Sequence, residues 1–391
     1  MAARSFATTL ATAEDIARAL AEAKGAVASA SSGGAATASG GLVFVSGALT
    51  QQVGRVAEQV RAAWRGVPAC VIPAAGVLTE RGEIEGATAA SGVLWTGGST
   101  VPFAISELGE GSDAVLGEAI DEAAGGRRAT ALVFARPESF KTEYLEAIGQ
   151  RAAGAPALQV FGAGTVGGAA IVVTAEGKLL EAPIAGLVLK GLAPPISDAS
   201  PACKLLSQFE RIDEASSGMV ARIGGKPALD LLSALTAELP RQQGQQPLVF
   251  AALAEGEPDG EGRERYVVRP VRGIDPARKS VLIGREARPG VRFAFGVRDA
   301  AAARAGLQDM ARQVAQQALG AAPRFAIYLS CAGRGQGLYG AADVEARILR
   351  QRFGDLPIAG MHSAFEIAPF GPGQAKLALY TGVLALFRSP S

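Results

Sequence analysis

The chain of 391 residues is long enough for two or three domains, or for one large one. Hydrophobic residues make up 49% of the chain and charged residues 19%, which predicts a sizeable core and excludes a disordered protein. The 38 basic and 37 acidic residues leave a net charge of +1. This balance argues against nucleic acid as the main partner and against a polybasic membrane anchor.

The numbers and positions of the cysteines and of the histidine exclude several kinds of disulfide and metal site. Cys70, Cys203 and Cys331 lie far apart without a CxxC pair, so neither a disulfide framework nor a zinc site is expected. The chain begins without the apolar core of a secretion signal, and its apolar runs are too short to span a bilayer. We therefore expect a cytoplasmic protein without membrane insertion. His362 is the single histidine, which excludes a multi-histidine metal site.

In chain order, a unit of strand, helix and strand recurs three times. The first copy has strands at 42–49 and 66–76 around a helix at 51–64. The second has strands at 131–139 and 154–164 around a helix at 143–152. The third has strands at 325–335 and 354–366 around a helix at 342–353. A further strand-like run follows each copy, at 90–98, 184–191 and 377–387. The pattern predicts an α/β protein with mixed sheets, in two lobes, with repeated βαββ-like units and approximate internal symmetry.

Two glycine- or proline-rich stretches are candidate linkers, 191–201 and 239–247. We expect lobes at 1–232 and 233–391, with the boundary between residues 195 and 247. The segment "GAGTVG" at 162–167 fits the GxGxxG pattern of dinucleotide-binding proteins. The residues after it predict a hairpin rather than the helix that would hold a pyrophosphate, so nucleotide binding is rejected.

Several segments, taken in order, resemble FIST-domain proteins, which pair a FIST N-domain with a FIST C-domain. They are "GVLTERGEIEGATAASGVL" (76–94), "IGGKPALDLL" (223–232), "RYVVRPVRGID" (265–275), "YLSCAGRGQGLYG" (328–340) and "GMHSAFEIAPFGPGQAKLALYTGVLALF" (360–387). The resemblance implies a small-molecule-binding sensory protein in signal transduction, with an amino-acid-like ligand and a separate signalling partner. It also implies that the chain is not an enzyme.

Apart from Glu83, the candidate ligand-binding residues lie at the ends of the two strands predicted within 325–335 and 354–366. Arg334 lies in a glycine-rich loop, where its guanidinium could hold a carboxylate, and replacing it with alanine is expected to leave the fold intact. Glu83 and Glu366 follow similar sequence patterns and could receive an ammonium group. The remaining members of the set are Cys331, Gly335, His362 and Ser363. If the two strands run parallel, their ends form one concave surface.

Other interpretations stay open. Arg334 could be a solvated loop residue, and Glu83 and Glu366 could pair with local arginines. Cys331 could be an inert buried thiol or the nucleophile of an enzyme of unidentified chemistry. No cofactor is expected, although some family members resemble haem-based gas sensors and His362 could serve as an axial ligand. A scaffold without a ligand is the third alternative.

Overall fold

The computed structural model describes residues 2–9, 12–30, 37–108, 112–152, 158–237, 239, 248–254, 258, 264–371 and 374–389. The chain forms two compact units. Unit 1 combines residues 1–200 with residues 307–391, and unit 2 consists of residues 201–306. Unit 2 is therefore an insertion in the sequence of unit 1. Among the described residues, no helix is both long enough and apolar enough to cross a membrane.

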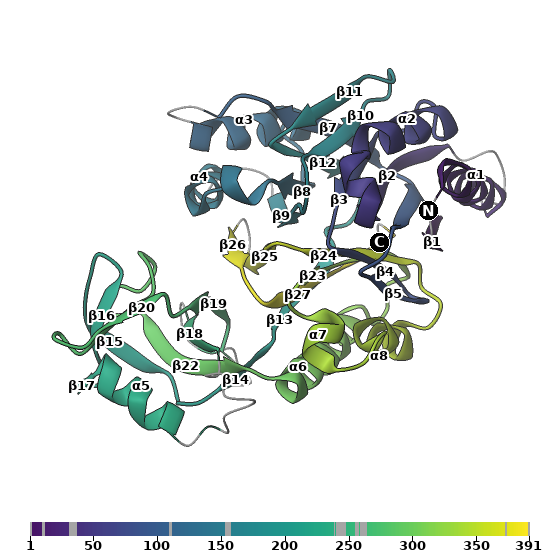
Figure 1. Cartoon of the computed structure of the whole chain (residues 1–391). Coiled ribbons are helices and arrows are strands. Elements are labelled where there is room, and N and C mark those ends of the chain that lie inside the picture. Colours follow the sequence, from purple (N-terminus) through teal and green to yellow (C-terminus); the bar gives the residue numbers. More distant parts are fainter. Residues whose placement is uncertain are drawn as a thin grey trace. The chain divides into compact units, whose positions relative to one another are not determined.

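Unit 1 consists of three copies of one arrangement (Figure 1). The first copy contains β1 (Ala3–Thr9), α1 (Ala13–Ser29), β2 (Ala38–Ser46), α2 (Val53–Ala63), β3 (Ala69–Pro73), β4 (Gly76–Thr79), β5 (Gly82–Glu85) and β6 (Ala89–Thr96). The second contains β7 (Ser99–Ile105), α3 (Ser112–Ala124), β8 (Ala129–Ala135), α4 (Thr142–Ala152), β9 (Leu158–Gly164), β10 (Ala170–Val173), β11 (Leu179–Ala182) and β12 (Ile184–Lys190). Short 3₁₀ turns at Gly47–Gln51 and Pro137–Ser139 precede α2 and α4.

The third copy is interrupted by unit 2 after its first strand. It contains β13 (Ile196–Pro201), α6 (Ala300–Gln317), β23 (Pro323–Cys331), α7 (Gly335–Tyr339), α8 (Val344–Phe353), β24 (Ile358–Ser363), β25 (Glu366–Gly371), β26 (Gln374–Ala378) and β27 (Thr381–Arg388). In each copy a parallel pair joined by a helix is the centre of the sheet: β2 with β3, β8 with β9, and β23 with β24. A later strand pairs antiparallel with the first member: β6, β12 or β27.

The three copies exchange hairpins in a cycle. The strand orders of the sheets are β1-β6-β2-β3-β10-β11, β7-β12-β8-β9-β25-β26 and β13-β27-β23-β24-β4-β5. The hairpin of each copy thus extends the sheet of another copy. Backbone hydrogen bonds join the copies where the exchange begins: Ala75 donates to His362, Val166 to Pro73, and Gly164 to Phe365. Each sheet is therefore incomplete without a segment from a neighbouring copy.

The inner faces of the three sheets form one shared core. Side chains in this core alternate along their strands, as in Leu42 and Phe44 of β2, Leu132 and Phe134 of β8, and Phe325, Ile327 and Leu329 of β23. The outer face of the first sheet is covered by α1 and α2, and that of the second by α3 and α4. Strands buried on both faces explain the continuous apolar runs in the sequence.

Unit 2 is smaller: its described strands form one sheet, one described helix lies wholly within it, and α6 begins in it. Its strands follow the order β19-β18-β22-β15-β16-β21-β20, and β14 and β17 pair with β22 and β16. Their bounds are β14 (Cys203–Leu205), β15 (Glu210–Ser216), β16 (Met219–Ile223), β17 (Lys226–Pro227), β18 (Val249–Ala254), β19 (Tyr266–Pro270), β20 (Gly273–Asp275), β21 (Ser280–Leu282) and β22 (Arg292–Arg298), with α5 at Ala228–Ala237. The aromatic rings of Phe293 and Phe295 meet edge to face in its core.

These observations confirm the predicted α/β class, the mixed sheets and the repeated units. The segment after "GAGTVG" forms the hairpin β10–β11, as predicted. The expected division at 232/233 stays a prediction, and the two compact units have other bounds. Of the two predicted linkers, 191–201 contains β13 and the first boundary between the units. The other, 239–247, lies outside the described residues apart from Leu239.

Candidate functional site

Apart from Glu83, which lies in β5, the predicted site residues lie at or shortly after the ends of β23 and β24. The two strands are parallel neighbours, and their register places Ser330 beside His362 and Cys331 beside Ser363. The sequence-based expectation that these two chain segments meet therefore agrees with the topology. Because side chains alternate along a strand, however, each pair belongs to a different face of the sheet.

On the inner face, Cys331 continues the row of core residues. Ser363 donates a 2.7 Å hydrogen bond to Glu366, which also accepts one from the Thr381 backbone at 3.3 Å. Burial raises the pKa of Glu366 well above its usual range. Burial, with the nearby Glu366 carboxyl, raises the pKa of the Cys331 thiol to about 12. Burial therefore favours the protonated, uncharged forms of both Cys331 and Glu366.

On the outer face, Arg334 forms a buried ion pair with Glu345. Arg334 Nε donates to Glu345 Oε1 at 2.6 Å, and both side chains are 0% exposed. The other guanidinium nitrogens donate to the Ser200 carbonyl at 2.7 Å and the Tyr339 hydroxyl at 3.1 Å. The Glu345 carboxylate also accepts hydrogen bonds from Ser330 and Tyr339. Every nitrogen of the guanidinium thus has a partner within the protein.

Arg334 and Glu345 each stabilise the charged form of the other. Burial alone would lower the pKa of Arg334, but the Glu345 carboxylate reverses that effect and raises it. Burial alone would raise the pKa of Glu345, but the Arg334 guanidinium holds it below its ordinary value. The carboxylate that we expected Arg334 to hold was that of a ligand. The carboxylate that it contacts in the structure is Glu345.

His362 lies near this ion pair and faces the hairpin β4–β5. Its Nε2 atom is 3.5 Å from Glu83 Oε2, and both side chains are 2% exposed. Neither ring nitrogen has a hydrogen-bond partner among the described residues. Burial alone would lower the pKa of His362, but the Glu83 carboxylate raises it. Glu83 lies on the side of the ring from which an axial haem iron would approach Nε2, and haem binding stays an untested alternative.

Glu83 and Glu85 are both attached to the helices that follow β23. Glu83 Oε1 accepts hydrogen bonds from the Glu345 and Ala346 amides at the start of α8, where the positive end of the helix dipole favours a carboxylate. The Glu85 carboxylate accepts one from the Gln336 amide. Gly335 permits this contact, because a Cβ atom there would lie 2.0 Å from Glu85 Oε2. The described donor atoms of Glu83, Glu85 and His362 are close enough to share one metal ion.

Despite their similar sequence patterns, Glu83 and Glu366 do not occupy equivalent positions of the repeat. Glu83 lies in β5, the second strand of its hairpin, whereas Glu366 is the first residue of β25, the first strand of its hairpin. Their similar sequence patterns therefore belong to different positions of the repeat.

Sequence reasoning missed Glu345, although a signal was available. In α8, Glu345 shares a helical face with Ile348 and Leu349, both of which are buried. A charged residue on an apolar face requires a buried partner of opposite charge. That requirement could have directed attention to Arg334 as the partner.

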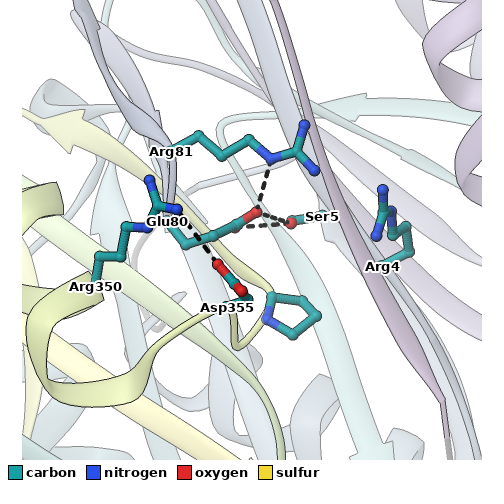
Figure 2. A pocket seen from close by; sticks show the side chains of 7 residues that line it. Arg4, Ser5, Glu80, Arg81, Arg350 and Asp355 are labelled. Carbon is teal, nitrogen blue, oxygen red and sulfur yellow. Dashed lines mark hydrogen bonds and ion pairs between the residues drawn. The ribbon is translucent and has the colours of Figure 1, made fainter.

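A cavity of about 510 Å³ in unit 1 was also missed. It lies beside the start of β24, and its lining residues are Arg4, Ser5, Glu80, Arg81, Arg350, Asp355 and Pro357. Figure 2 shows the three arginine side chains on different sides of the Glu80–Ser5 pair. Glu80 is buried and accepts hydrogen bonds from the Ser5 hydroxyl at 2.8 and 2.9 Å and from the Ile358 amide at 3.0 Å.

The arginines of this cavity are weakly paired. Arg81 Nε lies 3.5 Å from Glu80, and Arg350 lies 3.5 Å from Asp355, whose side chain is 91% exposed. Arg4 has no ion-pair partner among the described residues. These guanidinium groups contrast with that of Arg334, which is fully buried and fully bonded.

Fold and motifs together define a mixed α/β protein with three repeats and an inserted unit. The chain matches the FIST N domain over residues 40–226 and the FIST C domain over residues 228–369. It therefore belongs to the FIST-domain family. FIST domains are associated with signal transduction and the sensing of small ligands. The join between the two matched regions falls within unit 2, so the family domains and the compact units divide the chain differently.

Curated relatives include the uncharacterized protein Rv0628c of Mycobacterium tuberculosis. It is 29% identical over 214 residues, which cover 54% of this chain and 55% of the relative. The uncharacterized protein Mb0898c of Mycobacterium bovis is 29% identical over 216 residues, which cover 54% of each chain. The chain thus matches about half the length of the curated relatives, whose names assign no function.

Proposed function

We propose that the protein senses a small amino-acid-like molecule bound in the cavity of Figure 2, and that it acts through a separate signalling partner. The observation that carries the proposal is the presence of three weakly paired guanidinium groups around one cavity. The cavity volume of about 510 Å³ falls within the range of small-molecule sites.

Charge complementarity supports an amino acid as the ligand class. Guanidinium groups bind carboxylates in a fork of two parallel hydrogen bonds, so Arg4 and Arg350 are suited to an α-carboxylate. Glu80 is already bonded to Ser5 and Ile358, which leaves Asp355 as the carboxylate for a ligand ammonium group. The sequence suggested that Arg334 binds a ligand carboxylate and that Glu83 binds a ligand ammonium group. The proposed site uses the same two interactions but assigns them to the cavity residues.

The position of the cavity supports a sensory role. Arg350 lies in the last turn of α8, whose first amides hold Glu83. Arg81 lies in the turn between β4 and β5, two residues before Glu83. A ligand that draws Arg350 and Arg81 together would therefore act on both elements that meet at Glu83. Through these two elements, ligand binding would change the positions of other parts of the third sheet.

A thermal-shift assay with a panel of the twenty amino acids tests the proposal. We expect at least one of them to raise the melting temperature of the wild-type protein. Its amidated and decarboxylated forms, which lack the carboxylate, should leave the melting temperature unchanged. The double variant Arg4→Gln/Arg350→Gln should lose the response. Arg61→Gln, which changes an exposed arginine on α2 outside the cavity, should retain it. An equal response in both variants would contradict the proposed site.

A further inference from the structure

We propose that Glu83, Glu85 and His362 form a binding site for one divalent first-row transition-metal ion. The argument for this site does not rest on the proposed amino-acid cavity. One donor atom from each residue lies within 4.8 Å of the donors of the other two. One imidazole nitrogen and two carboxylate oxygens are suitable ligands for zinc and for neighbouring metals of its row.

The state of His362 is the observation that points to a ligand. The ring is 2% exposed, and both nitrogens lack a hydrogen-bond partner among the described residues. A buried imidazole normally has such a partner, because leaving a buried polar group without a hydrogen bond destabilises the fold. Nε2 is 3.5 Å from Glu83 Oε2, so a cation between these two atoms would satisfy the nitrogen.

The separation between Nε2 and Glu83 Oε2 fits a shared metal better than a direct hydrogen bond. At 3.5 Å it exceeds the usual length of an N–H···O bond, which is about 2.7–3.2 Å. Two ligands bound about 2.1 Å from a tetrahedral zinc ion lie about 3.4 Å apart. The observed distance therefore matches that between two ligands of one coordination shell.

The surrounding backbone orients the two carboxylates. Amides of α8 hold Glu83 Oε1 and leave Oε2 facing His362. The Gln336 amide holds Glu85, and Gly335 leaves room for its carboxylate. Gly76 likewise leaves room for the imidazole, since a Cβ atom there would lie 2.9 Å from His362 Cδ2. Such outer contacts are typical of metal ligands.

The charges of the three side chains favour a cation as well. Two carboxylates face a single imidazole, so even a protonated ring would leave one negative charge unbalanced. A divalent ion would neutralise both carboxylates and keep the imidazole neutral. Three protein ligands would leave one position of a tetrahedral ion open to water or another small ligand.

Zn²⁺ binding to the full chain tests the site. The protein is stripped with a chelator, incubated with Zn²⁺, desalted and analysed for metal by mass spectrometry. We expect about one equivalent in the wild type and in the exposed control Glu22→Gln. His362→Gln and Glu85→Gln should weaken binding by at least tenfold, as loss of a ligand or of its support does. Equal retention of Zn²⁺ by the wild type and both ligand variants would overturn the proposal.

A second measurement needs no variant. Because His362 is the only histidine, ¹⁵N-labelled histidine gives the signals of a single imidazole. We expect one equivalent of Zn²⁺ to shift the Nε2 resonance to that of a metal-bound nitrogen. Co²⁺ should give a visible spectrum without a strong thiolate charge-transfer band. An unchanged Nε2 resonance, or a thiolate band that places the ion on a cysteine, would overturn the proposal.

Discussion

Arg334 and Glu345 form an ion pair of 2.6 Å in which both side chains are completely buried. The two residues come from the loop after β23 and from α8, so the pair fixes the helix to the strand end. Removing one partner of a buried ion pair leaves the other charge unsolvated, which costs about 3–5 kcal/mol. We therefore revise the expectation that replacing Arg334 with alanine leaves the fold intact.

We predict that Glu345→Gln lowers the free energy of unfolding by about 3–5 kcal/mol, measured by urea denaturation at neutral pH. The double variant Arg334→Met/Glu345→Leu should lose less than the sum of the two single losses, because no isolated charge remains. The control is Arg312→Ala, which breaks an exposed pair with Asp309 and should cost less than about 1 kcal/mol. Equal effects of Glu345→Gln and Arg312→Ala would refute the structural role.

Glu366 should make stability depend on pH. Its folded-state pKa is raised by burial, so above about pH 4.3 the unfolded state loses its proton while the folded state keeps it. The contribution of Glu366 therefore falls as pH rises from that value to the folded-state pKa, by up to about 1.4 kcal/mol per unit. Glu366→Gln should flatten this decline, measured by urea unfolding as the pH is raised from about 5. Parallel pH profiles for variant and wild type would show that Glu366 ionises normally.

The Cys331 thiol should be unreactive in the folded protein. Burial and the nearby Glu366 raise its pKa to about 12, against about 8.5 for a free thiol, so the thiolate fraction falls by roughly a thousandfold or more. We expect native protein to react very slowly with a disulfide reagent at pH 8, and all three cysteines to react in guanidinium chloride. A fast-reacting native thiol that disappears in Cys331→Ser would instead favour the enzyme interpretation.

Two glycines should respond in opposite ways to substitution by alanine. A Cβ atom on Gly360 in β24 would lie 2.0 Å from the Tyr328 carbonyl oxygen, so Gly360→Ala should destabilise the fold by at least about 1–3 kcal/mol. Gly25 in α1 has open space around it, and Gly25→Ala should stabilise by about 0.5–1 kcal/mol. Thermal unfolding measures both. A neutral Gly360→Ala would mean that β23 and β24 lie farther apart than described.

The sequence predicted the repeats because each strand and helix carries its own apolar pattern. It also predicted that the ends of the strands at 325–335 and 354–366 are neighbours if the strands run parallel, since a helix between parallel strands returns the chain to the same edge. The cyclic exchange of hairpins was not predictable, because a hairpin pattern does not specify which sheet it extends. The interruption of the third copy by unit 2 was missed for a similar reason: two segments of one compact unit can be far apart in sequence.

The candidate site was predicted only in part. Ser330 and Cys331 are consecutive residues of one strand. Because side chains along a strand alternate between the two faces of the sheet, the sequence is enough to assign these two to opposite faces. The partners of Arg334 could not be identified in the same way, since Ser200 lies 134 residues away. The cavity arginines come from β1, the β4–β5 turn and α8, and only the folded sheet brings them together.

The central claim is that the arginine-lined cavity binds an amino-acid-like molecule. Native mass spectrometry of the full chain incubated with the amino-acid panel tests it most directly. We predict a one-to-one adduct with at least one amino acid in the wild type and in Arg61→Gln, and its loss in Arg4→Gln/Arg350→Gln. The absence of any adduct on folded wild-type protein, or an adduct that persists in the double variant, would contradict the account.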